Sequence, residues 1–166
     1  MAERNTTFAL WQRLSGQPFG RRIFSVGLCL RAPYFATVLP EVRTMRPGYA
    51  EVRSPKWWGV HNHVGTFHAI AACNLAEAAM GMLAEATVPP THRWLPRGMT
   101  TEYVAKATTG LRAVAQLSEI PDFNDDAMDL PVPVTVYDRA DKPVVHAVIV
   151  IRVSPQRAPV AASTSR

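Results

Sequence analysis

Two ionisable side chains stand out within a largely apolar stretch of this sequence. His68 and Glu77 lie within residues 61–85, a stretch rich in Ala, Leu and Met that contains no Pro. A carboxylate can act as a general base or as a nucleophile, and an imidazole can orient a carbonyl group beside it. Residues 61–85 therefore hold candidate groups for acyl-transfer or acid–base chemistry.

The element that must position these groups is a single long helix, expected at about residues 66–85. Ala, Leu and Met are strong helix formers. Gly65 and Thr66 suit the N-cap, where a threonine oxygen accepts from a free N–H of the first turn. Pro89 and Pro90 cannot continue the helix, so they mark its end.

The helical spacing keeps His68 and Glu77 apart within one chain. Nine positions correspond to two and a half turns and about 13 Å along the axis, so the two side chains leave opposite sides of the helix. In a symmetric dimer with antiparallel helices, Glu77 of one chain can approach the His68 end of the other. The sequence therefore predicts two equivalent sites shared between subunits.

The expected helix is central, because only His68, Asn74, Glu77 and Glu85 are polar between positions 67 and 85. A membrane span is the competing interpretation, since the length is close to that of a bilayer crossing. Polar groups in its middle argue against a span. We expect a buried helix and no membrane span.

Composition limits the remaining classes of partner and location. The chain has 166 residues, 48% of them hydrophobic, with a net charge of +5 and a pI near 9.7. Its Lys and Arg residues are scattered, without a basic run or a nucleic-acid-binding motif, so we expect no nucleic-acid partner. Cys29 and Cys73 lie in apolar stretches and are expected to be unpaired. The N-terminal residues lack an apolar signal core, and a cytoplasmic location is expected.

Shorter patterned segments surround the helix. Residues 1–33 are expected to be a helical lead-in, with a helix over 3–15 and either a second helix or an irregular segment over 18–32. Residues 154–166 are expected to be a disordered tail. The segment 36–39 and 42–45 is expected to be a strand interrupted by Pro40, and further strands are expected at 49–53, 94–107, 110–119, 132–138 and 144–153. Turn residues at 46–48, 108–110 and 138–143 predict hairpins.

This order of elements predicts an α+β fold of the hotdog type over residues 34–153. Two strands, one long apolar helix and four more strands can bury each other only if the sheet curls around the helix. We therefore expect a largely antiparallel sheet of about six strands wrapped around one central helix.

The helix region also resembles a known family. The runs NHVGTFH at 62–68 and LAEAAMG at 75–81 are similar to hotdog-fold acyl-CoA thioesterases of the phenylacetic-acid-pathway type. In those enzymes the helix opens with Asn and then His-Gly-Gly, and Leu-x-Asp/Glu-x-Ala-x-Gly follows. Ala69 and Ile70 stand where the family has two glycines. A hydroxyl that some members supply from the next strand would fall near Pro96, with Thr100 and Thr101 a few residues later. The chain resembles a divergent, poorly characterised branch.

The resemblance implies hydrolysis of an acyl-CoA, or of another acyl thioester, by a homodimer or a dimer of dimers. In such a site Glu77 would be the base or the nucleophile, and His68 would orient the carbonyl. The backbone N–H of Ala69 would stabilise the oxyanion at the positive end of the helix dipole. Asn62 would hold the water or the carboxylate. No cofactor is expected, because CoA enters as part of the substrate.

Further residues are candidates for substrate binding. Gly65 and His63 belong to the motif, and Trp58 suits either the core or the wall of an acyl or CoA entrance. Lys106 and Arg112 can meet CoA phosphates or simply be solvated. The triplet at 61–63, His-Asn-His, is a weak metal motif because the helix places no complete tetrahedron beside it. We expect no metal site.

Several alternatives stay open at this stage. Glu77 can instead form a structural ion pair, His68 can be a hydrogen-bonded core residue, and Asn62 can cap a turn. A hydratase or dehydratase acting on acyl thioesters is a second enzyme class, since His63 and Glu77 have a suitable spacing. A non-catalytic acyl-thioester binding protein is the third, with Ala69 and Ile70 closing the active geometry.

Overall fold

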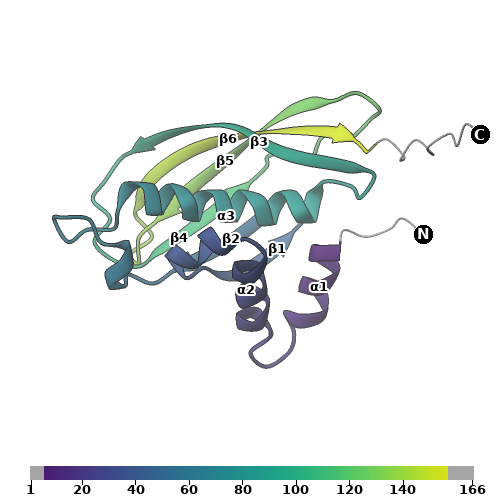
Figure 1. The fold of residues 1–166 in the computed structure, drawn as a ribbon. Coiled ribbons are helices and arrows are strands. Elements are labelled where there is room, and N and C mark those ends of the chain that lie inside the picture. The colour runs from purple at the N-terminus through teal and green to yellow at the C-terminus, as the bar shows by residue number, and fades with distance from the viewer. Residues whose placement is uncertain (1–5, 157–166) are drawn as a thin grey trace, which may run out of the picture.

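The computed structural model describes residues 6–156, which form a curled antiparallel sheet around one long helix (Figure 1). The helix, α3, spans Ala69–Thr87. The strands are β1 (Glu41–Arg46), β2 (Tyr49–Ser54), β3 (His92–Tyr103), β4 (Leu111–Gln116), β5 (Met128–Tyr137) and β6 (Pro143–Pro155). The predicted α+β hotdog architecture, with two strands before the helix and four after it, is confirmed.

The strand order is β1-β2-β4-β5-β6-β3, so β3 forms one edge of the sheet and β1 the other. Hairpins join β1 to β2 and β5 to β6, as expected. The expected hairpin at 108–110 is wrong, because β3 and β4 are not neighbours. Residues 104–110 are a crossover that runs past the start of α3, where the N–H of Phe67 donates to the carbonyl of Ala107 at 2.8 Å.

The core lies between α3 and the concave face of the sheet. Leu75, Met80 and Leu83 of α3 are fully buried against inward-facing strand residues such as Val52 and Ile149. By length and hydropathy α3 could cross a membrane, but 61% of its apolar window is buried inside the fold. Burial of this kind is typical of the central helix of a hotdog domain.

The N-terminal lead-in is helical, as predicted: α1 spans Thr6–Leu14 and α2 spans Gly20–Arg31. Trp11 and Phe24 join the two helices edge to face, with ring centroids 5.2 Å apart. The strand expected at residues 36–39 is wrong, because a 3₁₀ helix, η1, spans Pro33–Val38. Leu39 then adopts a left-handed conformation with φ 45°, which turns the chain into β1.

The C-terminal strands extend further than predicted. β5 begins at Met128 instead of position 132, and β6 includes Ser154 and Pro155, which were expected in the disordered tail. The remainder of that expected tail, residues 157–166, and the first five residues lie outside the described part of the chain. In β5, Pro131 and Pro133 precede the stretch 134–137 that pairs with β4.

Candidate functional site

The candidate site is built around the start of α3, which lies three residues later than the predicted N-terminus. His68 is the N-cap, and its Nδ1 accepts a hydrogen bond from the N–H of Ile70 at 3.1 Å. The predicted N-caps, Gly65 and Thr66, lie in the preceding loop. An accepting Nδ1 places the ring proton on Nε2, so the exposed edge of His68 can donate a hydrogen bond.

The N-terminal turn of α3 retains free donors. The N–H of Ile70 goes to the His68 ring and that of Ala72 to the His68 carbonyl, at 3.0 Å. The N–H groups of Ala69 and Ala71 have no partner among residues 6–156. Such N–H groups at the positive end of a helix dipole suit an oxyanion, which is the role proposed from sequence for Ala69.

Asn62 organises the loop that leads into this turn. Its Oδ1 accepts from the N–H groups of Val64 (3.1 Å) and Thr66 (3.0 Å), and its Nδ2 donates to the Thr66 hydroxyl at 2.7 Å. Gly65 lies within the same loop with φ 74°, a conformation that favours glycine. The arrangement supports the turn-capping interpretation of Asn62, since both ends of its amide are engaged.

Glu77 is the unusual residue of α3. It is half-buried on a helix whose neighbouring positions 74–76 and 78–84 are all buried, and it forms no hydrogen bond or ion pair with any residue in 6–156. The structure thus provides no intramolecular arginine partner for this carboxylate. Ile70, Cys73 and Glu77 follow one another at helical spacing, so they form one exposed stripe along the N-terminal half of α3.

The edge strand β3 runs beside this stripe, and sequence reasoning missed the contribution of Tyr103 on this strand. Cys73 Sγ lies 3.1 Å from the phenolic oxygen of Tyr103 and 3.8 Å from Oγ1 of Thr101. Hydrogen bonding to Cys73, with a smaller contribution from burial, raises the pKa of Tyr103 to about 12. The family resemblance placed a hydroxyl of this strand near Pro96, whereas the hydroxyls beside α3 belong to Thr101 and Tyr103, further along β3.

On the other side of the stripe lies a small pocket of about 200 Å³ between α3, η1 and the loop before the helix. Its lining includes His61, His68, Ile70, Tyr34 and Asn74. Asn74 is 5% exposed, and its Nδ2 donates to the Thr37 hydroxyl at 3.0 Å. Its Oδ1 is buried without a hydrogen-bond partner within the described residues. This pocket places an apolar side chain and two imidazoles beside the free donors of the first turn.

The loop itself forms a second depression of about 520 Å³, lined by Trp58, His63 and Gly65 among others. Trp58 is 85% exposed, so the core interpretation of this residue is wrong. It lies in η2 (Trp58–Val60), at the same end of the molecule as the start of α3. These three candidate substrate-binding residues are therefore grouped together at the N-terminal end of the central helix.

The two basic candidates differ in their positions. Lys106 is exposed on the crossover, next to Ala107, whose carbonyl accepts from Phe67 at the entry to α3. Arg112 belongs to β4 and faces away from α3, because its neighbours Leu111 and Ala113 fill the buried face. It pairs with Asp141 at 2.8 Å and with Glu51 at 3.6 Å. Its guanidinium also lies over the Tyr137 ring.

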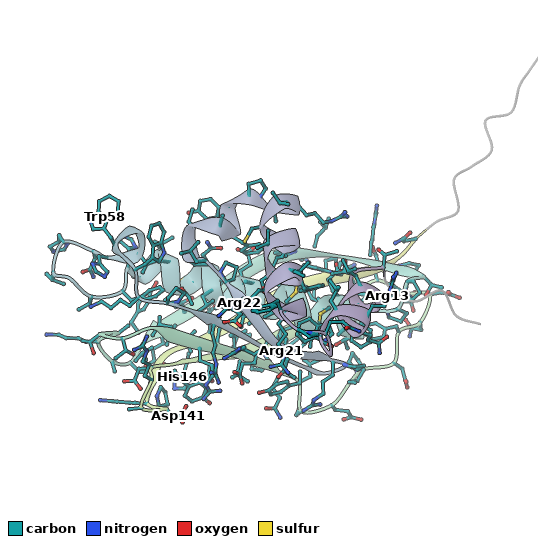
Figure 2. The ribbon with its side chains drawn as sticks, turned by 90° about the horizontal axis from the view of Figure 1, so that it is seen from below. Arg13, Arg21, Arg22, Trp58, Asp141 and His146 are labelled. Carbon is teal, nitrogen blue, oxygen red and sulfur yellow. The ribbon has the colours of Figure 1, made fainter. Side chains whose placement is uncertain are left out.

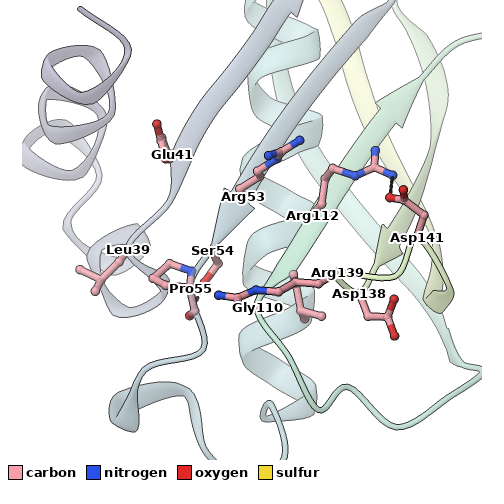
Figure 3. Close-up of a pocket in the computed structure, with 11 residues that line it drawn as sticks. Leu39, Glu41, Arg53, Ser54, Pro55, Gly110, Arg112, Asp138, Arg139 and Asp141 are labelled. Atoms are coloured by element: carbon pink, nitrogen blue, oxygen red, sulfur yellow. Dashed lines mark hydrogen bonds and ion pairs between the residues drawn. The ribbon is translucent and has the colours of Figure 1, made fainter. Parts of the chain in front are cut away.

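Arg112 thus belongs to a separate cavity of about 530 Å³ at the end of the sheet (Figure 3). Arg53 and Arg139 line the same cavity, together with Glu41, Asp138 and Asp141. The mixture of three basic and three acidic side chains does not favour an anion strongly, so the cavity is a weaker candidate than the start of α3. Within residues 6–156 no three His, Cys, Asp or Glu side chains are grouped for a metal ion.

The structure therefore gathers some of the predicted residues and separates others. His68, Ala69, His63, Gly65 and Trp58 meet at the start of α3. Glu77 lies two turns further along the helix, on its exposed stripe, so a single chain does not bring it to His68.

Comparisons with known proteins agree with this fold. The crystal structure of a genomics target, APC5556, is 44% identical to this chain with a TM-score of 0.78, covering 90% of this chain and 98% of that one. A Pseudomonas aeruginosa protein of unknown function, called a probable thioesterase, is 18% identical with a TM-score of 0.70, covering 77% and 91%. A thioesterase from Haemophilus influenzae is 10% identical with a TM-score of 0.67, covering 81% and 90%.

At such low identities, the last two likenesses establish the hotdog fold alone. No curated protein matches the sequence. The family model described as a domain of unknown function, DUF4442, matches residues 20–153. The chain with this hotdog domain and its helical lead-in is therefore a member of the DUF4442 family.

Proposed function

We propose that this protein hydrolyses an acyl thioester, with acyl-CoA as the preferred form, in a site shared across a homodimer. The observation that carries the proposal is the unpaired carboxylate of Glu77 on the otherwise apolar central helix. A half-buried carboxylate without a partner costs stability, and catalysis explains why it is there. The probable thioesterase and the thioesterase that share the fold support the same class of reaction.

The chemistry follows from the groups at the two ends of the stripe. The thioester carbonyl oxygen accepts from the free N–H of Ala69 and is oriented by His68 Nε2. Glu77 takes a proton from water while the water oxygen attacks the carbonyl carbon, or attacks that carbon itself to give an anhydride that water then cleaves. The C–S bond breaks, and the thiolate leaves and takes up a proton. The products are a free acid and a free thiol.

The proposed contact with the second subunit is the edge strand β3. β3 has one side unpaired within residues 6–156, and Gly98–Tyr103 contains no proline that would remove a donor. Leu95, Met99 and Tyr103 on this strand, and Ile70 beside it on α3, are large side chains left exposed. A second copy paired along β3 about a two-fold axis would cover them and bring the two α3 helices antiparallel.

Such a dimer would move each Glu77 toward the partner's helix start. The two sites would each combine the first turn of α3 from one chain with the carboxylate of the other. Trp58 and His63, which line one depression, and Lys106 on the crossover would contact the CoA portion of the substrate. No nucleic-acid partner is proposed. Both described cysteines are free thiols, in keeping with a cytoplasmic protein.

The direct test is release of free thiol from short, medium, long and aryl acyl-CoA esters, measured with a thiol reagent. Glu77→Gln should lose at least about 100-fold in kcat, since general-base catalysis contributes on that order. The matched control is Glu85→Gln on the same helix, because the Glu85 carboxylate already accepts a hydrogen bond from the indole N–H of Trp94 at 3.2 Å. It should retain wild-type kcat.

Three outcomes would contradict the proposal. Wild-type protein that binds acyl-CoA tightly without turnover would identify a binding protein in which Ile70 blocks attack. Hydration of an enoyl thioester in place of hydrolysis would identify the hydratase class. A monomeric mass in solution would remove the shared site.

A further inference from the structure

The helix α2 has two apolar faces, and only one of them is used by the fold. Phe24 is buried, and Leu28 packs against the core. On the other side lies a line of large apolar side chains that begins at the N-cap and continues into η1. Its members are Phe19, Ile23, Val26, Leu30 and Tyr34, which are between 57% and 79% exposed.

Helical spacing places the central members of this line together. Ile23, Val26 and Leu30 follow one another at steps of three and four, so they lie on one side of α2. Phe19 precedes this helix as its N-cap, and Tyr34 follows it in η1. We call these five residues the α2 ridge. Soluble monomers rarely expose so long a contiguous apolar patch, and such patches mark interaction sites.

Arginines border the ridge, and the described residues of the lead-in that carries it have no carboxylate side chain. Arg22 and Arg31 lie on either side of it at helical spacing, and both are exposed. Arg13 and Arg21 belong to the same helical lead-in, and Figure 2 shows Arg13, Arg21 and Arg22 on the side where α1 and α2 face the viewer. Residues 6–40 contain no Asp or Glu, and none of these four arginines pairs with a carboxylate of residues 6–156.

A second copy of the chain does not suit this surface. In an isologous contact the same patch meets itself, so Arg22 and Arg31 would face arginines across the two-fold axis. The ridge also lies apart from the edge strand proposed for dimerisation, because α2 and β3 lie on opposite sides of α3 (Figure 1). A helix with a large apolar face and flanking arginines instead matches the pattern of peptides that lie in the interface of a bilayer.

We propose that the α2 ridge docks on an anionic phospholipid surface. The apolar side chains enter the acyl boundary, while Arg22 and Arg31 reach back to lipid phosphates. Tyr34 belongs both to the ridge and to the 200 Å³ pocket beside His68. Docking therefore places the mouth of that pocket at the lipid surface, where acyl groups partition. The docking itself does not depend on the proposed thioesterase activity.

The experiment is co-sedimentation of the full-length protein with vesicles of phosphatidylcholine, with and without phosphatidylglycerol. Wild type should bind the anionic vesicles and bind more weakly as salt rises, because screening reduces the attraction to phosphates. Ile23→Asn/Leu30→Asn and Arg22→Glu/Arg31→Glu should each bind at least tenfold more weakly. Their secondary structure and thermal unfolding should match wild type, since all four side chains are exposed.

Matched controls separate docking from general surface effects. Arg93→Glu/Lys142→Glu makes the same change in net charge on exposed side chains outside the lead-in, and Val148→Asn removes an exposed apolar side chain from β6. Both should bind like wild type. Absence of binding by the wild type, or equal binding by the ridge variants, would overturn the proposal. A change in oligomeric mass in the ridge variants would overturn it in favour of a second copy.

Discussion

The sulfur of Cys73 lies 3.1 Å from the phenolic oxygen of Tyr103, which joins the central helix to the unpaired edge strand. The contact lies on the exposed stripe of α3, one turn before Glu77. It therefore borders the surface through which a second subunit would approach. Neither residue was singled out as a functional candidate from sequence, and both now belong to the border of the candidate site.

The first prediction concerns the ionisation of Tyr103. The pKa of Tyr103 is raised to about 12, mainly by its hydrogen bond with Cys73. Cys73→Ala removes that partner, so the pKa should move back toward the ordinary tyrosine value of about 10. An ultraviolet titration of tyrosinate would show this, and Tyr103→Phe identifies which step belongs to Tyr103.

The same shift has a consequence for stability. A phenol with a raised pKa holds its proton more tightly in the folded state, so the folded state is favoured fully below about pH 10 and loses this contribution as pH rises toward about 12. Wild type should therefore lose more stability over this window than Cys73→Ala. Parallel loss in both proteins would show that the hydrogen bond does not act in solution.

The second prediction tests whether a site uses two chains. Glu77→Gln and His68→Asn should each be inactive, the latter with its helix cap preserved because Asn is a good N-cap residue. Co-expression of the two variants forms mixed dimers in which one site has both groups. Random pairing should restore about a quarter of wild-type activity. Mixtures that stay inactive would place the complete site within one chain, or outside these residues.

The third prediction concerns the loop that leads into α3. Asn62→Ala removes three hydrogen bonds to Val64 and Thr66 and should lower the free energy of unfolding by about 1–2 kcal/mol. Asn62→Asp keeps an acceptor for both N–H groups and should lose less. Urea denaturation measures both, and Asn124→Ala, which removes one exposed loop hydrogen bond, is the control. An unchanged free energy of unfolding in Asn62→Ala would contradict the structural role and favour a direct role of this side chain with substrate.

The fourth prediction compares two glycines, one with space for an added Cβ and one without. A Cβ at Gly81 in α3 would meet only the edge of the Trp94 ring at 3.6 Å, which is ordinary contact. Gly81→Ala should therefore stabilise the protein by about 0.5–1 kcal/mol through helix propensity. A Cβ at Gly20 would overlap the carbonyl oxygen of Leu14, so Gly20→Ala should destabilise it by about 1–3 kcal/mol. Thermal unfolding of both variants decides the comparison, and the same sign in both would refute it.

The central helix and the general strand order were predictable because their signals are local. A run of apolar helix formers before Pro89 predicts a buried helix, and the alternating strands β4, β5 and β6 each bury one face. The start of the helix was placed too early because Thr66 is an acceptable cap by type, whereas His68 is the residue whose ring accepts from the first turn.

The errors have physical causes that the sequence does not display. Residues 108–110 look like a hairpin turn, but β-sheet neighbours are decided by long-range burial, and β3 pairs with β6 instead. Val38 and its neighbours have strand-like residue types, yet Pro33 starts a 3₁₀ turn and Val38 is fully buried by it. The sequence left Trp58 open between the core and a substrate entrance, and its 85% exposure excludes the core.

The candidate site was predictable in its residue types and not in its arrangement. The position of His68 and the half-exposure of Glu77 follow from where the helix starts and which face the sheet leaves open. The contact between Cys73 and Tyr103 joins positions 30 apart, so no local pattern could reveal it. Arg112 looked available by charge, and only the structure shows its carboxylate partners.

Pro131 and Pro133 give β5 a feature with a consequence for assembly. Both lie at alternate positions before the stretch paired with β4, so both lack a backbone donor on the same flank of the strand. A strand added on that side would lack two backbone hydrogen bonds, whereas Gly98–Tyr103 of β3 retains every amide hydrogen. β3 is one of the two edge strands of the sheet. A second copy paired with it about a two-fold axis, as proposed above, would cover this edge and leave no open strand there for fibre growth.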